Sequence, residues 1–291
     1  MERIIRSIRM TKPSESTLTA QHRLRRIEGR HNALVKQLRQ AFARAELTDR
    51  GDCAIEGLRI LEEAIRSGLR FSAVFFRESA QDRADRLLPQ IGAQVETLLL
   101  PDKLFDSVVP SESPQGVAAL VRLKEFSLDD ISERLQVGPI VVAAGLQDPG
   151  NLGTLLRSSE AFGCAGVVLG EGTVSPFNSK VVRGSAGSIF RLPIVHGHGK
   201  NPAKLQEVLE KLRAKRIRLI ATSSHKGTSL AQSNLQGEVA IFFGNEGAGL
   251  PRDVMAKMDE FVSIPHVQQV ESLNAGVAAS IVLYEAAKQR K

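Results

Sequence analysis

The chain has 291 residues, of which 42% are hydrophobic and 24% charged, so it can form two domains with ordinary buried cores. No apolar run approaches the roughly 18 residues that cross a bilayer, and no secretory signal follows the first methionine, so we expect no membrane span and a cytoplasmic protein. The two cysteines, Cys53 and Cys164, have no paired spacing, which excludes a disulfide framework and a cysteine-based zinc site.

The first predicted element is a basic N-terminal arm over residues 1–29. Residues 1–50 contain twelve Lys/Arg and five Asp/Glu, and the rest of the chain contains 27 of each sign, so the whole net charge of +7 is N-terminal. The segment His22–Gln40 is typical of a surface that binds a polyanion, because each neutralised phosphate releases counterions. A solvated helix face would explain the same charges equally well.

Residues 30–123 predict a small α/β domain. Ala54, Leu58, Leu61 and Ile65 recur at helical spacing. Short apolar runs of strand length follow at Phe71–Phe76, Val95–Leu100 and Gly116–Leu123. A charged, weakly patterned stretch over residues 124–137 is interpreted as a linker.

Residues 138–291 predict a parallel sheet with helices on both faces. Nearly uninterrupted apolar runs occur at Pro139–Leu146, Gly166–Gly170, Arg218–Ser224, Val239–Gly244 and Phe261–Pro265. Helical patterns lie between most of them, as in Pro202–Arg216. Strands of this kind are buried on both faces, and their ligands gather beyond the carboxyl ends.

The first cluster of residues that could form a reactive or binding site is LQDPGNLGTLLRSSEAFG, Leu146–Gly163. Asn151 is placed to cap the helix that follows the turn. Gly153 precedes Arg157 by four residues, so a bare backbone and a guanidinium on one helix face could meet an anionic group. A simple cap and a surface arginine are the alternative.

The second cluster is GNEGAGLP, Gly244–Pro251, with Glu246 in a glycine-rich turn after a buried strand. It lacks the Gly-x-Gly-x-x-Gly order of a dinucleotide site and the Gly-Lys-Ser/Thr of a phosphate-binding loop. The glycines favour tight folding against a neutral or cationic ligand. An ordinary strand-to-helix turn, with Pro251 opening the helix, is the alternative.

The third cluster spans Ile264–Arg290. Ser272 is a candidate N-cap, and Asn274 lies in the first helical turn, where amides favour polar partners. An apolar stripe follows at Leu273, Val277, Ile281 and Tyr284. Both polar residues could instead serve only as caps.

In order and chemistry, the three clusters resemble the motifs of the SPOUT methyltransferases, in the SpoU/TrmH branch of RNA ribose 2′-O-methyltransferases. The resemblance rests on Asp148–Arg157, Gly244–Leu250, Ile264-Pro265 and Glu271–Asn274, and VVRGSAGSIFRLPI (Val181–Ile194) resembles the segment between motifs. Residues 30–123, with Ala54–Ile65 and Gln115–Val121, resemble more loosely the ribosomal-protein-like RNA-holding domain of many members.

This resemblance implies a parallel sheet tied in a trefoil knot that binds S-adenosyl-L-methionine, a homodimer formed through the C-terminal domain, and no metal. The substrate would be RNA, with ribosomal RNA favoured and transfer RNA as the alternative. The cofactor would contact Thr222, Gly244, Ile264 and Leu273. The carried-over catalytic residues are Asn151, Arg157, Glu246, Ser272 and Asn274. Arg157 would stabilise the attacking oxyanion or hold a phosphate, and Glu246 would orient Asn151 or the polar groups of the third cluster.

Three other functions are compatible with parts of the sequence. An inactive RNA-binding family member would require broken cofactor loops or a missing Arg157. A nicotinamide or flavin enzyme would require fingerprint glycines after Leu146. A zinc hydrolase built on His196 and His198 would require a third ligand nearby.

Overall fold

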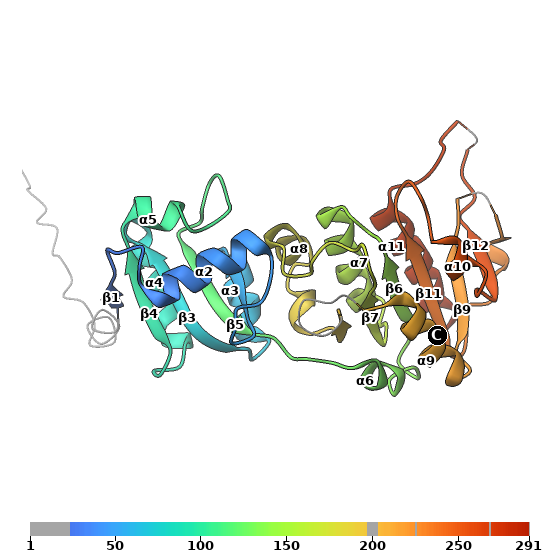
Figure 1. Cartoon of the computed structure of the whole chain (residues 1–291), viewed down its shortest axis with the longest axis horizontal. Helices are drawn as coiled ribbons and strands as arrows, with labels where there is room; N and C mark the ends of the chain where they lie inside the picture. The colour runs from blue at the N-terminus through green and yellow to red at the C-terminus, as the bar shows by residue number, and fades with distance from the viewer. Residues whose placement is uncertain (1–23, 197–202, 225, 268, 291) are drawn as a thin grey trace, which may run out of the picture.

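The protein contains two α/β units that lie side by side along its long axis (Figure 1). The structure is a computed structural model that describes residues 24–196, 203–224, 226–267 and 269–290. Most of the expected basic arm, residues 1–23, lies outside the described residues. An extended segment after β5 (Val117–Arg122) connects the two units (Figure 1).

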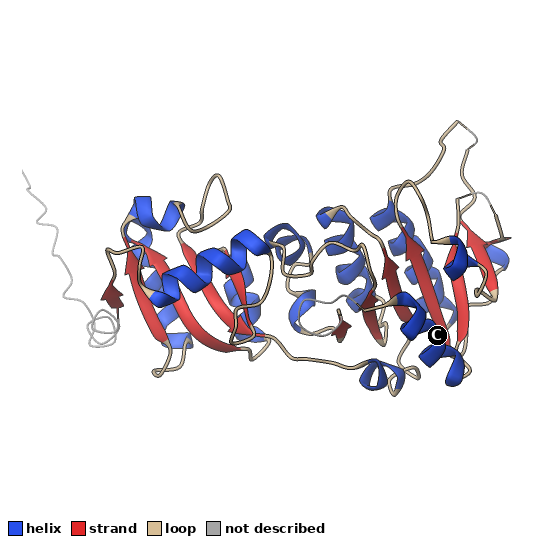
Figure 2. Ribbon diagram, in the orientation of Figure 1, coloured by secondary structure: helices blue, strands red, loops and turns tan. Residues whose placement is uncertain are grey.

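The first unit is a mixed sheet in the order β1-β4-β3-β5-β2, with helices on both faces (Figure 2). β1 and β3 run parallel to β4, whereas β5 is antiparallel to both β3 and β2. The other strands are β1 (Leu24–Arg26), β2 (Asp52–Glu56), β3 (Arg70–Arg77) and β4 (Glu96–Leu100). The helices are α2 (Ala33–Arg44), α3 (Leu58–Arg66), α4 (Gln81–Leu87) and α5 (Asp102–Asp106), with short 3-10 turns at Glu78–Ala80 and Leu88–Gln90. Apolar residues of α2 and α5 pack on one face, and those of α3 and α4 pack on the other.

Strand β2 was not predicted from the sequence, and the assignment of Ala54 to a helix was wrong. Ala54 lies in β2, and the helix α3 begins only after Gly57. Both ends of β2 are buried carboxylates that a local pattern would place on the surface. Arg122 Nε donates to Asp52 Oδ1 at 2.9 Å, and the hydroxyl of Ser111 donates to Glu56 at 2.9 Å. Burial of an acid is costly unless the acid is paired. The partners of Asp52 and Glu56 on other segments therefore allow these residues to be buried in a strand.

The second unit is a sheet in the order β10-β12-β9-β11-β6-β7-β8, and every strand pair in it is parallel. Its strands are β6 (Ile140–Ala144), β7 (Gly166–Leu169), β8 (Ile194–Val195), β9 (Arg218–Thr222), β10 (Thr228–Ser229), β11 (Val239–Gly244) and β12 (Glu260–Ser263). Its helices are α6 (Leu128–Ser132), α7 (Pro149–Ala161), α8 (Ser179–Gly184), α9 (Leu205–Ala214), α10 (Arg252–Met255) and α11 (Ala275–Gln289), with 3-10 turns η3 (Ser188–Phe190) and η4 (Leu230–Gln232). None of the described helices has the length and apolarity that a bilayer crossing requires.

Alternation along the central strands explains why both faces of this sheet are covered. Val141 and Ala143 belong to the apolar cluster that includes α7, α8 and α11, whereas Ile140 and Val142 belong to the cluster with α6, α9 and α10. Successive side chains of a strand point to opposite faces, so an uninterrupted apolar run needs a layer on each side. The predicted fold class, an α/β chain with a parallel sheet in its second half, is confirmed.

Two predicted irregular segments are partly structured. The end of the expected arm, Leu24–Arg26, forms β1 and pairs in parallel with β4. The expected linker contains α6, which Ser127 caps by accepting from the backbone of Asp130, and which buries Leu128 and Ile131 against the second sheet. The capping box and the burial of these two apolar residues both stabilise this short helix.

Candidate active site

The carboxyl ends of β6, β9, β11 and β12 meet at one edge of the second sheet. The register pairs Gly244 with Ala144, and Thr222 with Val262. The loops that leave these strands carry most of the predicted site residues, so the parallel topology brings the second cluster against the first.

The loop after β11 is folded by Asn245, whose role the sequence analysis did not identify. Its side-chain oxygen accepts from the backbone amides of Gly247 at 3.0 Å and Ala248 at 2.9 Å, and its amide donates to the carbonyl of Gly145 at 2.9 Å. An asparagine side chain that bonds to the backbone amide two residues on forms an Asx-turn, a common way to fold a tight loop. The loop folds back so closely that a Cβ on Gly244 would lie 2.5 Å from the carbonyl carbon of Gly249. The fold of the loop is therefore enough to require glycine at position 244.

Glu246 projects from this loop toward the start of α7. Its carboxylate accepts from Nδ2 of Asn151 at 3.0 Å and, at 3.4 Å each, from the backbone amides of Gln147 and Asp148. Burial opposes ionisation, but these hydrogen bonds outweigh it and hold the pKa of Glu246 below its usual value. The carboxylate is thus kept ionised at the N-terminus of a helix, where negative charge is favoured.

Asn151 lies between the second and third clusters. Its Nδ2 donates to Glu246, and its Oδ1 accepts from Nδ2 of Asn274 at 2.8 Å. Glu246, Asn151 and Asn274 therefore form one hydrogen-bonded chain that links the loop after β11 to the first turn of α7 and the N-cap of α11, and we call it the site triad. These hydrogen bonds fix the orientation of both amides. A carboxylate only accepts, so Nδ2 of Asn151 must face Glu246, and Nδ2 of Asn274 must then face Oδ1 of Asn151.

The predicted caps are corrected by the structure. The N-cap of α7 is Asp148, which accepts from the backbone amide of Asn151 at 2.7 Å, because Pro149 favours the first helical position and moves the cap before it. The N-cap of α11 is Asn274, which accepts from the amide of Val277, and not Ser272. Ser272 is exposed and makes no hydrogen bond to any residue that the structure describes.

Arg157 lies on α7 and is exposed. Within the described part of the chain its guanidinium has no ion pair or hydrogen bond, so it is available to a ligand. The sequence analysis expected a ligand to approach the backbone at Gly153, but the structure leaves no room for one there. Gly153 is buried against α8, and a Cβ there would lie 2.9 Å from Cα of Gly184.

Of the expected cofactor residues, Thr222 and Gly244 end β9 and β11, Ile264 follows β12, and Leu273 lies in the segment before α11. Thr222 donates its hydroxyl to the carbonyl of Phe242 at 3.0 Å, which ties the end of β9 to β11. Ile264 and Leu273 are half-buried, and the carbonyl of Ile264 contacts Nδ1 of His266 at 2.8 Å.

These features fit a purine nucleoside with a sulfonium centre better than a phosphate. Ile264 and Leu273 offer partly exposed apolar surface, and Leu273 has backbone groups without a partner among the described residues. Open space surrounds Gly249, where a Cβ would meet no atom within 4 Å. The charged group in this loop is the ionised Glu246, which favours a cation.

The described residues offer little support for the alternative of a zinc hydrolase. His196 packs edge-on against Phe177 with ring centroids 4.9 Å apart, and His198 lies outside the described residues. Within the ranges that the structure describes, no three histidine, cysteine or acidic side chains gather around a point where a metal could sit.

Residues 138–284 match the SpoU rRNA Methylase family, and residues 32–119 match the MRM3-like substrate binding domain. The chain belongs to the SpoU rRNA methylase family. The predicted family and enzyme class, an RNA ribose 2′-O-methyltransferase, are therefore confirmed.

Similar proteins cover most of the chain. The 23S rRNA (guanosine(2553)-2′-O)-methyltransferase RlmP of Bacillus subtilis is 30% identical over 261 residues, 90% of this chain and 98% of RlmP. The 23S rRNA (guanosine-2′-O-)-methyltransferase RlmB of Vibrio cholerae is 30% identical over 77% of this chain and 92% of its own length. Among solved structures, the SpoU methyltransferase AviRb of Streptomyces viridochromogenes in complex with AdoMet is 27% identical, with a TM-score of 0.76 over 89% of this chain and 98% of AviRb.

Proposed function

We propose that the protein transfers the methyl group of S-adenosyl-L-methionine to a ribose 2′-hydroxyl of 23S ribosomal RNA. The site triad, together with Arg157 on the same helix α7, carries this proposal, because the triad joins the loop after β11 to the starts of α7 and α11 at the edge where parallel sheets bind ligands. The expected cofactor is confirmed at the family level, since AviRb was crystallised with AdoMet. RlmP and RlmB, which both modify 23S rRNA, support the choice of RNA.

The residues of the site divide between binding and chemistry. Thr222, Gly244, Ile264 and Leu273 hold the cofactor, which when bound supplies an electrophilic methyl group. The site triad holds Asn274 and the start of α7 in place, and Ser272 contacts the substrate from the loop before α11. Glu246 also balances the positive charge at the site.

Arg157 positions the RNA and stabilises the developing oxyanion. A guanidinium stays protonated and is a poor base, so we assign it electrostatic stabilisation and a contact to the adjoining phosphate, which relays the proton. Planar bidentate contact distinguishes it from lysine. A variant Arg157→Lys that kept near-normal turnover would contradict the bidentate part.

We infer that the first unit, residues 30–123, holds the RNA, that residues 124–137 connect it, and that residues 138–291 form the catalytic domain with the family's trefoil knot. The match of residues 32–119 to a substrate binding domain supports this division. The basic arm over residues 1–29 adds charge for the same polyanion. We also propose a cytoplasmic location, which a ribosomal RNA substrate supports.

We also propose a homodimer through the C-terminal domain. Val277, Ile281 and Tyr284 form an apolar stripe on α11 and are 48%, 37% and 56% exposed. Such a stripe at helical spacing is suited to burial against a second copy. Tyr284 contacts Phe162, next to the end of α7, so a partner seated here would lie near the catalytic helix.

The decisive experiment is transfer of labelled methyl groups from S-adenosyl-L-methionine to RNA from a strain that lacks the gene. Mapping of the methylated ribose in 23S rRNA is expected to find one nucleotide that the wild-type enzyme modifies and Arg157→Ala does not. Methylation of transfer RNA instead would select the alternative substrate. Donor binding without transfer to any RNA would indicate an inactive family member.

A further inference from the structure

The segment Arg183–Arg191 lies between α7 of the second unit and the first unit, and it has no role in the proposed chemistry. On one side Gly184 contacts Gly153 of α7 so closely that a Cβ on Gly153 would lie 2.9 Å from its Cα. On the other side Gly187 adopts φ +91°, and a Cβ there would lie 2.8 Å from Cβ of Glu63 in α3. The segment therefore touches both the helix that carries Arg157 and the first unit.

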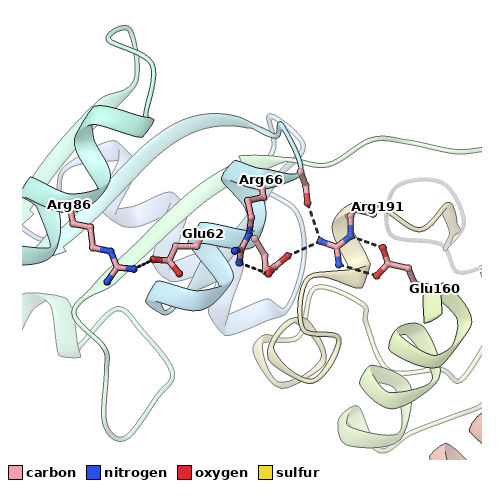
Figure 3. A network of polar contacts seen from close by, with 7 residues as sticks. Glu62, Arg66, Arg86, Glu160 and Arg191 are labelled. Carbon is pink, nitrogen blue, oxygen red and sulfur yellow. Dashed lines mark hydrogen bonds and ion pairs between the residues drawn. The ribbon is translucent and has the colours of Figure 1, made fainter.

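Arg191, at the end of this segment, bridges the two units directly (Figure 3). Its Nε and Nη2 donate to the two carboxylate oxygens of Glu160 at 2.5 and 3.0 Å. Its Nη1 donates to Oε2 of Glu63 at 2.8 Å and to the hydroxyl of Ser67 at 3.3 Å. One guanidinium thus holds a helix of each unit.

The position of Glu160 links this bridge to the candidate active site. Glu160 lies on α7, three residues after Arg157. The hydrogen bond from Arg191 lowers the pKa of Glu160, so the carboxylate is ionised and the bridge is intact at neutral pH. A change in the contact to α3 would therefore alter the first unit's placement relative to Arg157.

A second arginine of the segment adds a weaker contact. Arg183 Nη1 donates to the hydroxyl of Ser111 at 3.0 Å and lies 3.8 Å from Oε2 of the buried Glu56. Apolar contact also joins the units, because one continuous cluster includes Ile55 and Leu61 together with Ile189. Apolar burial is non-directional, whereas a forked guanidinium contact fixes an angle. The apolar cluster therefore holds the units together without fixing the angle between them, whereas the arginine contact is directional.

We propose that Arg191 is a positioning residue, which through Glu63 and Glu160 sets the RNA held by the first unit in register with Arg157. The proposal rests on the proposed function for its RNA readout, but its geometric part can be measured without RNA or donor. It predicts that breaking the contact to α3 weakens productive RNA binding and leaves donor binding unchanged.

The chain offers a matched pair of variants for the test. Glu63→Ala removes the ion pair of Arg191 with the first unit, together with the ion pair of Glu63 with Arg66 inside α3, and keeps the contact of Arg191 with Glu160. Glu62→Ala, one residue earlier on α3, removes the ion pair with Arg86, at 2.6 Å, which lies within the first unit (Figure 3). Both variants remove one negative charge, so any general gain in RNA affinity is common to them.

The orientation of the units is measured by distances between two spin labels. Labels are attached at Gln81→Cys on α4 and Glu210→Cys on α9, both of which are exposed. The native Cys53 and Cys164 are buried and free, so they escape labelling. Glu63→Ala and Arg191→Gln are expected to broaden the distance distribution, and Glu62→Ala is expected to match the parent chain.

The same variants, without labels, are then assayed for methyl transfer. For Glu63→Ala we expect the KM for RNA to rise about fivefold, which is typical of one partly exposed charged contact. The kcat and the donor Kd should stay within about twofold, a factor worth well under 1 kcal/mol. Arg191→Lys should raise the KM for RNA less than Arg191→Gln does, since lysine keeps the positive charge but lacks the forked guanidinium.

Two results would overturn the proposal. Equal distance distributions for Glu63→Ala and Glu62→Ala would show that Arg191 does not set the orientation. A broadened distribution with an unchanged KM for RNA would show that the orientation does not place the RNA. Absence of RNA methylation in the parent chain would refute the proposed function alone, because the distance measurement needs neither RNA nor donor.

Discussion

A second carboxylate at position 151 should break the site triad by charge repulsion. In the native protein, Nδ2 of Asn151 lies 3.0 Å from Oε1 of Glu246, and Asn151→Asp would place an oxygen there. Coulomb's law gives about 1.4 kcal/mol for two unit charges at 3.0 Å with a dielectric constant of about 80, and about 5.5 kcal/mol with about 20. Because Glu246 is on an exposed loop, the lower part of this range applies, and we expect a loss of about 2 kcal/mol in the free energy of unfolding.

This loss can be measured by thermal unfolding and by calorimetric titration with S-adenosyl-L-methionine. A loss of about 2 kcal/mol lowers Tm by about 4 to 8 °C in a chain of this size. Repulsion also moves the loop after β11, so we expect donor affinity to fall by up to about 30-fold. Glu246→Gln in the same chain should restore most of both quantities, because its amide can donate to the new carboxylate.

The double variant is the critical result. If Asn151→Asp with Glu246→Gln were no more stable than Asn151→Asp alone, the two side chains would not be coupled and the reasoning from their distance would be refuted. An unchanged Tm in the single variant would contradict it as directly.

Three further predictions follow from other contacts. Gly153→Ala should lower stability by about 1 kcal/mol in urea unfolding, because crowding against Gly184, which costs about 1 to 3 kcal/mol, exceeds the helix-propensity gain of up to about 1 kcal/mol; an unchanged midpoint would contradict this. Ile281→Asp should convert the proposed dimer to folded monomers in sedimentation and circular dichroism, whereas a monomeric wild-type chain would refute the dimer. The folded-state pKa of Glu246 is lowered, so its stabilising effect is complete above the usual value of about 4.3 and is lost as the pH falls through the folded-state pKa. Glu246→Gln should therefore lose less stability than wild type between about pH 6 and about pH 3, and parallel losses would count against the hydrogen bonds to this carboxylate.

Local sequence determined the regular part of this protein. Uninterrupted apolar runs such as Pro139–Leu146 and Val239–Gly244 predicted β6 and β11, because strands covered on both faces need apolar residues at every position. The polar residues just after those runs predicted where the site would lie. The motif resemblance then identified Asn151, Glu246 and Asn274 together, although no spacing could show that their side chains bond to one another.

Tertiary structure decided which group each of these residues contacts. Asn151 bonds to Glu246, 95 residues away, and to Asn274, 123 residues away, and Arg191 reaches Glu63 across 128 residues. Local patterns specify backbone conformation and which face is apolar, but contacts of this separation depend on strand order and register. The same holds for Asp52 and Glu56, whose charges oppose burial until partners from other segments reach them.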